Sequence, residues 1–363
     1  MNNYVYGAPA DIGMINNRKG FRAAQNRIAA LMFFVFALMM GSSVIYALGI
    51  NFFPGMTTST FRSELIQAIM YLGYMAVPVI LFGILRGKRP GVYFCFRRGK
   101  KHTVAVGFAA MGIIYFAQLC AVIMSDLFSA AGIDLNAASM QTTTEPAVII
   151  LRVIYVAVFP AIFEELVTRG IVLGELLPYG KGFAIITSGV LFALMHGNPI
   201  QLPFAFIAGV TMAYSVVACG TMRVSVVIHF MNNFLSVLFM SLPEIIPKEI
   251  AYSIEAAVSV LIFVFGAAAL LYLLKCKKKE KASQNADRDP ADTPPAPAVR
   301  DKWLCTVDDE PCKVDLRGGV LRNVTPLLYV YAVIMLFEAF STLITLAAMP
   351  AIQDFMEGVY GLV

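Results

Sequence analysis

Long apolar runs separated by short polar segments recur along almost the whole chain. Because a helix rises about 1.5 Å per residue, roughly 20 mostly apolar residues cross the hydrocarbon core of a bilayer. Eight runs are candidate membrane spans: Ile28–Ile50, Leu65–Leu85, Val104–Met124, Val153–Leu177, Phe183–His196, Leu202–Cys219, Val224–Leu242 and Ala256–Leu274. A ninth run, Pro326–Met349, has Glu338 as its only charge, and we prefer a ninth span to an interfacial or partner-binding helix. The pattern predicts an all-α, polytopic membrane bundle of eight or nine transmembrane helices.

The composition supports a membrane protein and excludes other classes. Apolar residues make up 59% of the 363 residues and charged residues 14%, whereas a soluble domain has about 25% charged residues. An ordinary soluble globule is therefore excluded, and so is disorder for most of the chain. The net charge, 28 − 23 = +5, is too small to indicate nucleic-acid binding, because most basic residues stand beside apolar runs.

Basic residues near the ends of the apolar runs predict the topology. They form three clusters: Arg18, Lys19, Arg22 and Arg27; Arg86, Lys88, Arg89, Arg97, Arg98, Lys100 and Lys101; and Lys275, Lys277, Lys278 and Lys279. The stretch Ser125–Ala147 has no Lys or Arg. Loops rich in Lys and Arg stay in the cytoplasm, so the N-terminus and residue 275 are expected there. The first 26 residues are polar, which favours a retained first helix over a cleaved signal peptide.

The segment before the ninth run has a different character. Ala282–Val299 is rich in Asp, Pro and Ala, a composition typical of a flexible tether. The six cysteines form no CxxC pair, and we interpret Cys305 and Cys312 as isolated thiols rather than a disulfide or weak metal site. The long cytoplasmic segment Lys275–Arg322 favours a membrane protein partner.

Charged side chains inside the fourth run need an explanation, because an ionised group at mid-bilayer costs on the order of 3 kcal/mol. Adjacent helical residues diverge by about 100°, so Glu164 and Glu165 cannot share one face. Glu165 stands one turn before Arg169, in the order that favours an ion pair. Glu164 is then expected to face a polar interior. The alternative is that the acidic pair marks a helix end at the membrane interface.

Two of the three histidines also fall inside apolar runs. His196 ends the fifth run, and His229 stands one turn before Asn233 in the seventh. A lone membrane histidine often serves only to hydrogen-bond neighbouring helices, which is the alternative to a ligand or a base. His102 lies in a basic loop and is expected to be solvated.

Depth decides whether these groups can meet. If the fourth helix runs from Val153 to Leu177, Glu164 lies roughly 20 Å from its cytoplasmic end, close in depth to His196. Asn233 would then be about 15 Å deep and His229 about 9 Å, so all four can line one cavity. The same helix would place Arg152 at the outer boundary, within reach of lipid headgroups. Pro160 can kink this helix and widen the cavity.

Three motifs in this order resemble the CAAX-protease and bacteriocin-processing (CPBP, Abi) family of intramembrane metalloproteases. That family carries EExxxR, FxxxH and HxxxN or HxxxD on successive membrane helices. Here the motifs begin at Glu164, Phe192 and His229, and the resemblance covers roughly Ala147–Met240. The motifs say nothing of prenylation, so the family name assigns no substrate.

The resemblance implies a division of labour within the site. Glu164 and His196 would activate a water, with Glu164 as general base, while His229 and Asn233 would stabilise the oxyanion or complete a metal site. Glu165, Arg169 and Phe192 would support them. Glu164, His196 and His229 are candidate ligands for a divalent metal such as Zn²⁺, although the chain has no HExxH motif. A glutamate-dependent hydrolase without tightly bound metal remains open.

The apolar runs and the resemblance together divide the chain. The segments are a cytoplasmic N-terminus (1–27), three accessory helices (28–146), a catalytic core of helices four to seven (147–242), an eighth helix (243–275), a flexible cytoplasmic tail (276–325) and an extra apolar segment (326–363). We expect a multi-pass protein of a bacterial plasma membrane that cleaves a membrane-associated peptide or protein. A non-catalytic scaffold or bacteriocin-immunity protein of the same family is the main alternative. A proton-relay transporter is a third, weakened by the lack of an internal repeat.

Overall fold

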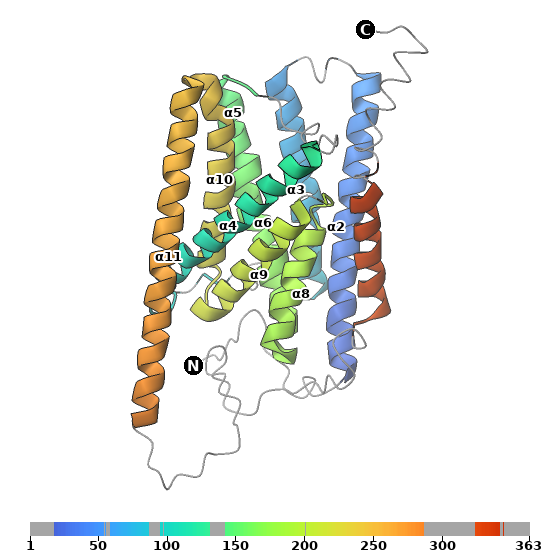
Figure 1. Ribbon diagram of the computed structural model, residues 1–363. Coiled ribbons are helices and arrows are strands. Elements are labelled where there is room, and N and C mark those ends of the chain that lie inside the picture. Colours follow the sequence, from blue (N-terminus) through green and yellow to red (C-terminus); the bar gives the residue numbers. More distant parts are fainter. Residues whose placement is uncertain are drawn as a thin grey trace.

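The protein is a bundle of long helices in the computed structural model, which describes residues 18–53, 55, 59–86, 95–96, 98–130, 142–199, 201–286, 324–341 and 344 (Figure 1). Within these ranges the chain forms no strand. The elements are α2 (Arg18–Phe52), α3 (Thr60–Leu85), α4 (Thr103–Ala130), α5 (Pro146–Arg152), η3 (Val153–Val158), α6 (Phe159–Glu165), η4 (Leu166–Val172), α7 (Leu173–Leu176), η5 (Leu177–Tyr179), α8 (Lys181–Leu194), α9 (Gln201–Cys219), α10 (Arg223–Ile245) and α11 (Lys248–Ala286). A further helix, Pro326–Ser341, packs beside α2.

Seven helices among the described residues are long and apolar enough to cross a membrane. They are Gly20–Phe52, Thr60–Leu85, Thr103–Ala130, Pro146–Tyr179, Gln201–Cys219, Arg223–Ile245 and Lys248–Lys279. The all-α polytopic bundle is therefore confirmed. The predicted count of eight or nine includes α8 and Pro326–Ser341, which are helices but shorter than a full span. The proposed tether, Cys305, Cys312 and the end of the ninth run lie outside the described residues.

The fourth span is one helical run in which the hydrogen-bond pattern switches twice from α to π and back. Two π-helical segments, η3 and η4, flank the seven residues of α6, and α6 carries Pro160 and both glutamates. In a π segment the backbone bonds span five residues instead of four, which widens the turn and occurs frequently at functional sites. The sequence predicts irregularity at Pro160, and the structure places a π segment directly before that proline.

The predicted contact of Arg152 with lipid headgroups is wrong. Its side chain is only 1% exposed and binds Glu64 of α3, with Nε 2.8 Å from Oε1. The hydroxyl of Tyr155 also donates to Glu64. A buried charge must be paired to be tolerated, and the partner lies 88 residues away in the sequence, where no local pattern reveals it. Arg152 therefore joins α5 to α3 instead of reaching lipid headgroups.

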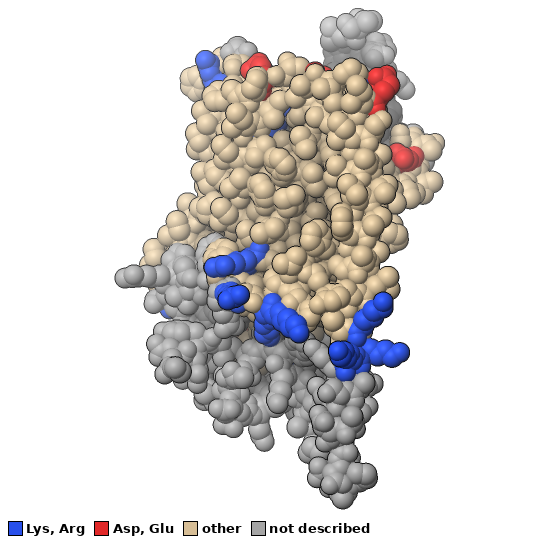
Figure 2. Space-filling view, turned by 90° about the vertical axis from the view of Figure 1, so that its left-hand side faces the viewer, with Lys and Arg blue, Asp and Glu red and all other residues tan. Residues whose placement is uncertain are grey.

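Charge is distributed unequally along the bundle axis. On the face that Figure 2 shows, most Lys and Arg side chains gather towards one end, and the Asp and Glu side chains lie towards the other end together with a few basic ones. Near the basic end, Glu175 of α7 binds Arg27 of α2 at 2.6 Å and Arg86 of α3 at 3.3 Å. This shared carboxylate ties three helices together on the side where α2 begins and α3 ends.

Helices α8 and α9 pack unusually closely, and this brings the site together. A Cβ built at Gly209 would lie 2.9 Å from the Cα of Gly189 and 3.1 Å from Cδ1 of Phe192. Only glycine allows the two backbones to approach this far, as is common where membrane helices associate. The contact sets the position of Phe192, and with it the end of α8, against the fourth span.

Candidate functional site

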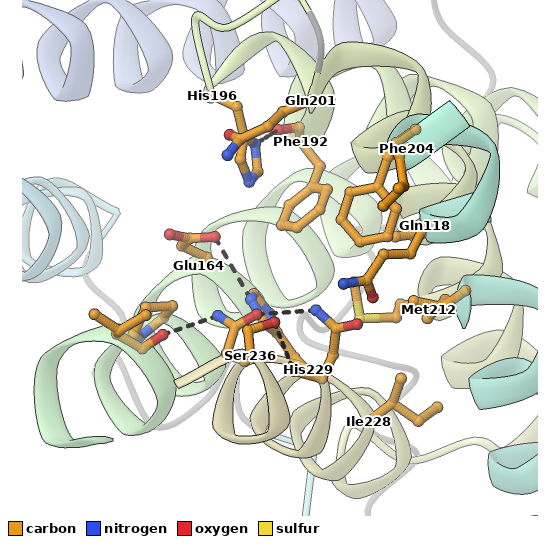
Figure 3. A pocket seen from close by; sticks show the side chains of 18 of the residues that line it. Gln118, Glu164, Phe192, His196, Gln201, Phe204, Met212, Ile228, His229 and Ser236 are labelled. Atoms are coloured by element: carbon orange, nitrogen blue, oxygen red, sulfur yellow. Dashed lines mark hydrogen bonds and ion pairs between the residues drawn. The ribbon is translucent and has the colours of Figure 1, made fainter. Parts of the chain in front are cut away.

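A cavity of about 560 Å³ lies inside the bundle and gathers the polar residues that the sequence singles out (Figure 3). Glu164, His196, His229 and Asn233 all line it. Its remaining lining residues are Tyr71, Ile114, Gln118, Ala121, Val122, Ser125, Tyr155, Val156, Pro160, Phe192, Gln201, Phe204, Ala208, Met212, Ile228, Asn232 and Ser236. The wall is thus mostly apolar, with a few polar groups converging from separate helices, as in many ligand sites.

Glu164 presents its carboxylate to this cavity from the end of α6. Oε1 accepts a hydrogen bond of 2.9 Å from the hydroxyl of Tyr71, and Oε2 lies 3.8 Å from Nε2 of His229. The side chain is 15% exposed, so it remains accessible from the cavity. A carboxylate has acceptor sites on both oxygens, and therefore the Tyr71 contact leaves capacity for a water or a substrate group.

Glu165 points away from Glu164, as the divergence of adjacent helical residues requires. It is fully buried, and its Oε1 accepts 2.6 Å from Arg169, so the ion pair expected from the spacing is present. The guanidinium also donates to the carbonyl of Gly209 at 3.0 Å and to the hydroxyl of Thr168 at 2.7 Å. Several donors and acceptors thus compensate the desolvation of this buried pair.

The same carboxylate orients His229. Oε1 of Glu165 lies 2.9 Å from Nδ1 of His229, and a carboxylate paired with arginine acts as an acceptor. Nδ1 therefore carries a proton, and Nε2 faces Glu164. This arrangement, in which a carboxylate fixes one ring nitrogen and leaves the other for chemistry, is common for functional histidines.

His196 is fixed by its own helix end. Nδ1 lies 2.8 Å from the carbonyl of Phe192, which can only accept, so Nδ1 is the protonated nitrogen. The Phe192 ring contacts both imidazoles edge to face, with centroids 4.9 Å from His196 and 5.6 Å from His229, and the Arg169 guanidinium lies 4.3 Å from it. Phe192 therefore packs among three polar side chains and restricts their orientations.

Asn233 connects α10 to the irregular part of the fourth span. Its Nδ2 donates 2.9 Å to the carbonyl of Val156, and its Oδ1 accepts 3.1 Å from Asn232. Val156 belongs to the π segment η3, so this bond holds α10 to the irregular part of the fourth span.

Sequence reasoning missed seven polar residues that line the cavity: Tyr71, Gln118, Ser125, Tyr155, Gln201, Asn232 and Ser236. Asn232 adjoins the motif asparagine, and Gln118 is an isolated amide within an apolar run, so both could be flagged as polar residues at depth. Tyr71 lies 93 residues from Glu164 in an apolar segment, where tyrosine is unremarkable, and no sequence signal indicates it.

The three side chains suggested as metal ligands do not form a ready metal site. Nowhere in the described part of the chain do three or more His, Cys, Asp or Glu side chains group closely enough to hold a metal ion. Zinc bound by Glu164, His196 and His229 therefore stays a prediction, and no step below depends on it.

Comparisons with known proteins agree with the motifs. Residues 146–235 match the family described as "Type II CAAX prenyl endopeptidase Rce1-like". A relative named "Membrane-embedded CAAX protease MroQ", from Staphylococcus aureus (strain USA300), is 25% identical over 206 residues, which cover 51% of this chain and 80% of the relative. No solved structure matches the chain. The match and the relative confirm the predicted resemblance to the CAAX-protease (CPBP) family.

These comparisons and the fold together support one broad class of protein. The seven candidate spans support a multi-pass membrane protein, and the family supports a CAAX-type membrane protease in general. The matched segment includes α5 to α9 and most of α10, up to Leu235. It therefore contains all of the motif residues, while Tyr71 and Gln118 come from helices before it.

Proposed function

We propose that the protein is an intramembrane endopeptidase that hydrolyses a peptide bond in a membrane-associated peptide or protein. The observation that carries the proposal is the convergence of Glu164, His196, His229 and Asn233 on one cavity, with His229 bound to Glu165 and Glu165 paired with Arg169. Peptide hydrolysis needs a base for water and donors for the developing oxyanion, and this cavity supplies both kinds of group.

In the proposed reaction, Glu164 takes a proton from a water held between its carboxylate and Nε2 of His196. The oxygen of that water then bonds to the carbonyl carbon of the scissile peptide, whose oxygen becomes an oxyanion. Glu164 next returns the proton to the amide nitrogen as the C–N bond breaks, which releases an amine and a carboxylic acid that then loses its proton to solvent. One glutamate thus acts first as base and then as acid.

The oxyanion is assigned to the α10 side of the cavity. The Asn233 amide has two hydrogens, and the bond to Val156 uses one of them. The other, together with His229 when Nε2 is protonated, can donate to the oxyanion. Both side chains are already oriented by hydrogen-bond partners, so little reorganisation is needed during the reaction.

The substrate is proposed to enter from the bilayer. Apolar side chains such as Ile114, Phe204 and Ile228 dominate the cavity wall and suit an apolar peptide segment better than a soluble, charged one. The concentration of Lys and Arg at one end of the bundle supports a cytoplasmic location for that end and for the N-terminus. The chemistry of the cavity gives no indication of a prenyl group on the substrate.

Replacing Glu164 by glutamine tests the proposal, because the amide keeps the shape but cannot act as a base. Membranes containing equal amounts of the wild-type and Glu164→Gln proteins are compared by mass spectrometry of released peptides. We expect fragments that appear with the wild type and disappear with the variant. Glu244→Gln, an exposed glutamate of α10 outside the cavity, is the matched control and should release the wild-type fragments.

Identical fragment profiles for the wild type and Glu164→Gln would overturn the endopeptidase proposal. If the cellular phenotype also survived in the variant, the non-catalytic scaffold or immunity role would be favoured instead.

A further inference from the structure

A second hollow lies between α4 and α11, away from the cavity that contains Glu164. Its volume is about 560 Å³, and it is lined by Lys101, His102, Val104, Ala105, Phe108, Phe265, Ala268, Ala269 and Tyr272. Lys101, His102 and Tyr272 are the polar residues of the lining, and Tyr272 lies beside His102, to which it is hydrogen-bonded; the other six residues are apolar. The groove is therefore amphipathic along its length.

The crossing of the two helices explains why the groove exists. Gly112 of α4 and Gly266 of α11 meet backbone to backbone, so that a Cβ built at Gly266 would lie 2.7 Å from the Cα of Gly112. The residues lining the groove in α4 are all N-terminal to that contact. On that side the small residues Ala105, Ala268 and Ala269 leave space that larger side chains would fill.

The groove runs from the edge of the membrane into its apolar core. Lys101 and His102 directly precede the span Thr103–Ala130, and α11 contains the span Lys248–Lys279. Phe108 is seven residues after Lys101, which corresponds to roughly 10 Å along the helix. One end of the groove thus lies at headgroup level and the other among acyl chains.

Charge at the headgroup end is predominantly basic, with Glu280 as the first acidic residue beyond Lys279. The stretches 98–112 and 262–279 contain Arg98, Lys100, Lys101, Lys275, Lys277, Lys278 and Lys279, and neither contains Asp or Glu. The Tyr272 hydroxyl and Nδ1 of His102 are hydrogen-bonded at 3.0 Å, which ties the two helices together at this point. His102 has a φ of 73°, a backbone conformation that a side chain disfavours, so this contact holds a strained residue in place.

We propose that this groove binds one anionic phospholipid, with its phosphate near Lys101 and His102 and an acyl chain along Phe108 and Phe265. An anionic headgroup complements the predominantly basic end, and an acyl chain complements the apolar walls. The site is separate from the proposed active site and does not depend on peptidase activity.

Native mass spectrometry of the full-length protein in mild detergent tests the proposal. The protein is incubated with equal amounts of phosphatidylglycerol and phosphatidylcholine of distinguishable mass. We expect a one-lipid adduct enriched in phosphatidylglycerol. Lys101→Gln should reduce that enrichment about fivefold, the effect of one lysine near an anionic lipid. Lys181→Gln, a charge-matched change at the start of α8 and outside the groove, should leave the enrichment unchanged.

A second pair of variants tests the apolar part of the groove. Ala268→Phe fills it without changing charge and should reduce adducts of both lipids. Val260→Phe is made on the same helix at a position that is 58% exposed and outside the groove, and should have no effect. Melting temperatures establish that all variants fold.

Three results would overturn the proposal. They are equal adducts of both lipids on the wild type, an unchanged lipid preference in Lys101→Gln, or a dimer that Ala268→Phe abolishes, which would make the groove an interface between copies. The Glu164→Gln protein should bind the lipid as the wild type does, so failure of this site and failure of the proposed protease are distinguishable.

Discussion

The Tyr71 hydroxyl forms the hydrogen bond that most directly fixes the orientation of the Glu164 carboxylate. It donates 2.9 Å to one carboxylate oxygen and thereby orients the other towards the cavity. Tyr71→Phe removes only this oxygen and keeps the ring. A hydrogen bond to a charged group contributes about 1.5–3 kcal/mol, so we expect peptide release to fall about 10- to 100-fold. The measurement is the initial cleavage rate of a substrate identified from the Glu164→Gln comparison.

Tyr74→Phe is the matched control for this change. Its ring contacts Tyr71 edge to face with centroids 5.1 Å apart, yet Tyr74 does not line the cavity. A similar loss of rate in both variants would contradict the assignment, because it would trace the effect to helix packing and not to the donor on Glu164.

The site residues differ in how far they could be predicted, and the reason is the distance over which each interaction acts. Glu165 and Arg169 interact within one helical turn, so their spacing alone predicts the pair. Tyr71 and Glu164 meet only because α3 packs beside α6, and nothing local to Tyr71 indicates this. Arg152 also depends on a partner that is distant in the sequence. Its place at the start of an apolar run suggested a lipid contact, because the sequence does not reveal that Glu64 lies beside it.

At the scale of the elements, the α8–α9 contact fixes the position of Phe192, which in turn contacts His196 and His229. Gly209→Ala would place a methyl group 2.9 Å from the Cα of Gly189 and 3.1 Å from the Phe192 ring. Overpacking of this kind costs about 1–3 kcal/mol of unfolding free energy. Because Phe192 contacts both histidines, its displacement should also lower activity, by up to about 100-fold. Thermal unfolding and the cleavage rate measure the two effects.

Gly73→Ala provides the comparison for a glycine in a helix without a close neighbour. Nothing lies within 4 Å of a Cβ built at that position of α3. Alanine favours a helix over glycine by about 1 kcal/mol, so this variant should be as stable as the wild type or more stable. If Gly73→Ala and Gly209→Ala were equally destabilised, helix packing at Gly209 could not be the cause.

The helices were far easier to predict than their internal irregularities. Hydropathy alone places every long helix of the described chain, because each must satisfy its backbone inside an apolar medium. It does not predict the π segments η3 and η4, since their hydrogen-bond register depends on how α6 is held by α3 and α10. Pro160 is the one residue whose chemistry signals the disturbance.

At the scale of the whole molecule, the last described helix joins two distant parts of the fold. Leu328, Tyr331, Met335 and Ala339 form one buried face of Pro326–Ser341. Tyr331 packs edge to face on Phe33 of α2 with ring centroids 5.4 Å apart. At the other end of the helix, a Cβ built at Gly197 would lie 3.6 Å from the carboxylate of Glu338. A segment outside the family match therefore contacts the turn directly after His196.

Because the helix Pro326–Ser341 packs on α2, replacing two of its aromatic residues should change the stability by different amounts. Tyr331 is 1% exposed, so Tyr331→Ala leaves a cavity against α2 and should cost about 3 kcal/mol of unfolding free energy. Phe337 is 74% exposed, and Phe337→Ala should change stability by no more than about 0.5 kcal/mol. Thermal unfolding of both variants in the same detergent measures the difference. Because the helix also contacts Gly197, Tyr331→Ala should slow cleavage as well, whereas Phe337→Ala should not. Equal stability of the two variants would mean that this helix does not pack on α2 in the membrane.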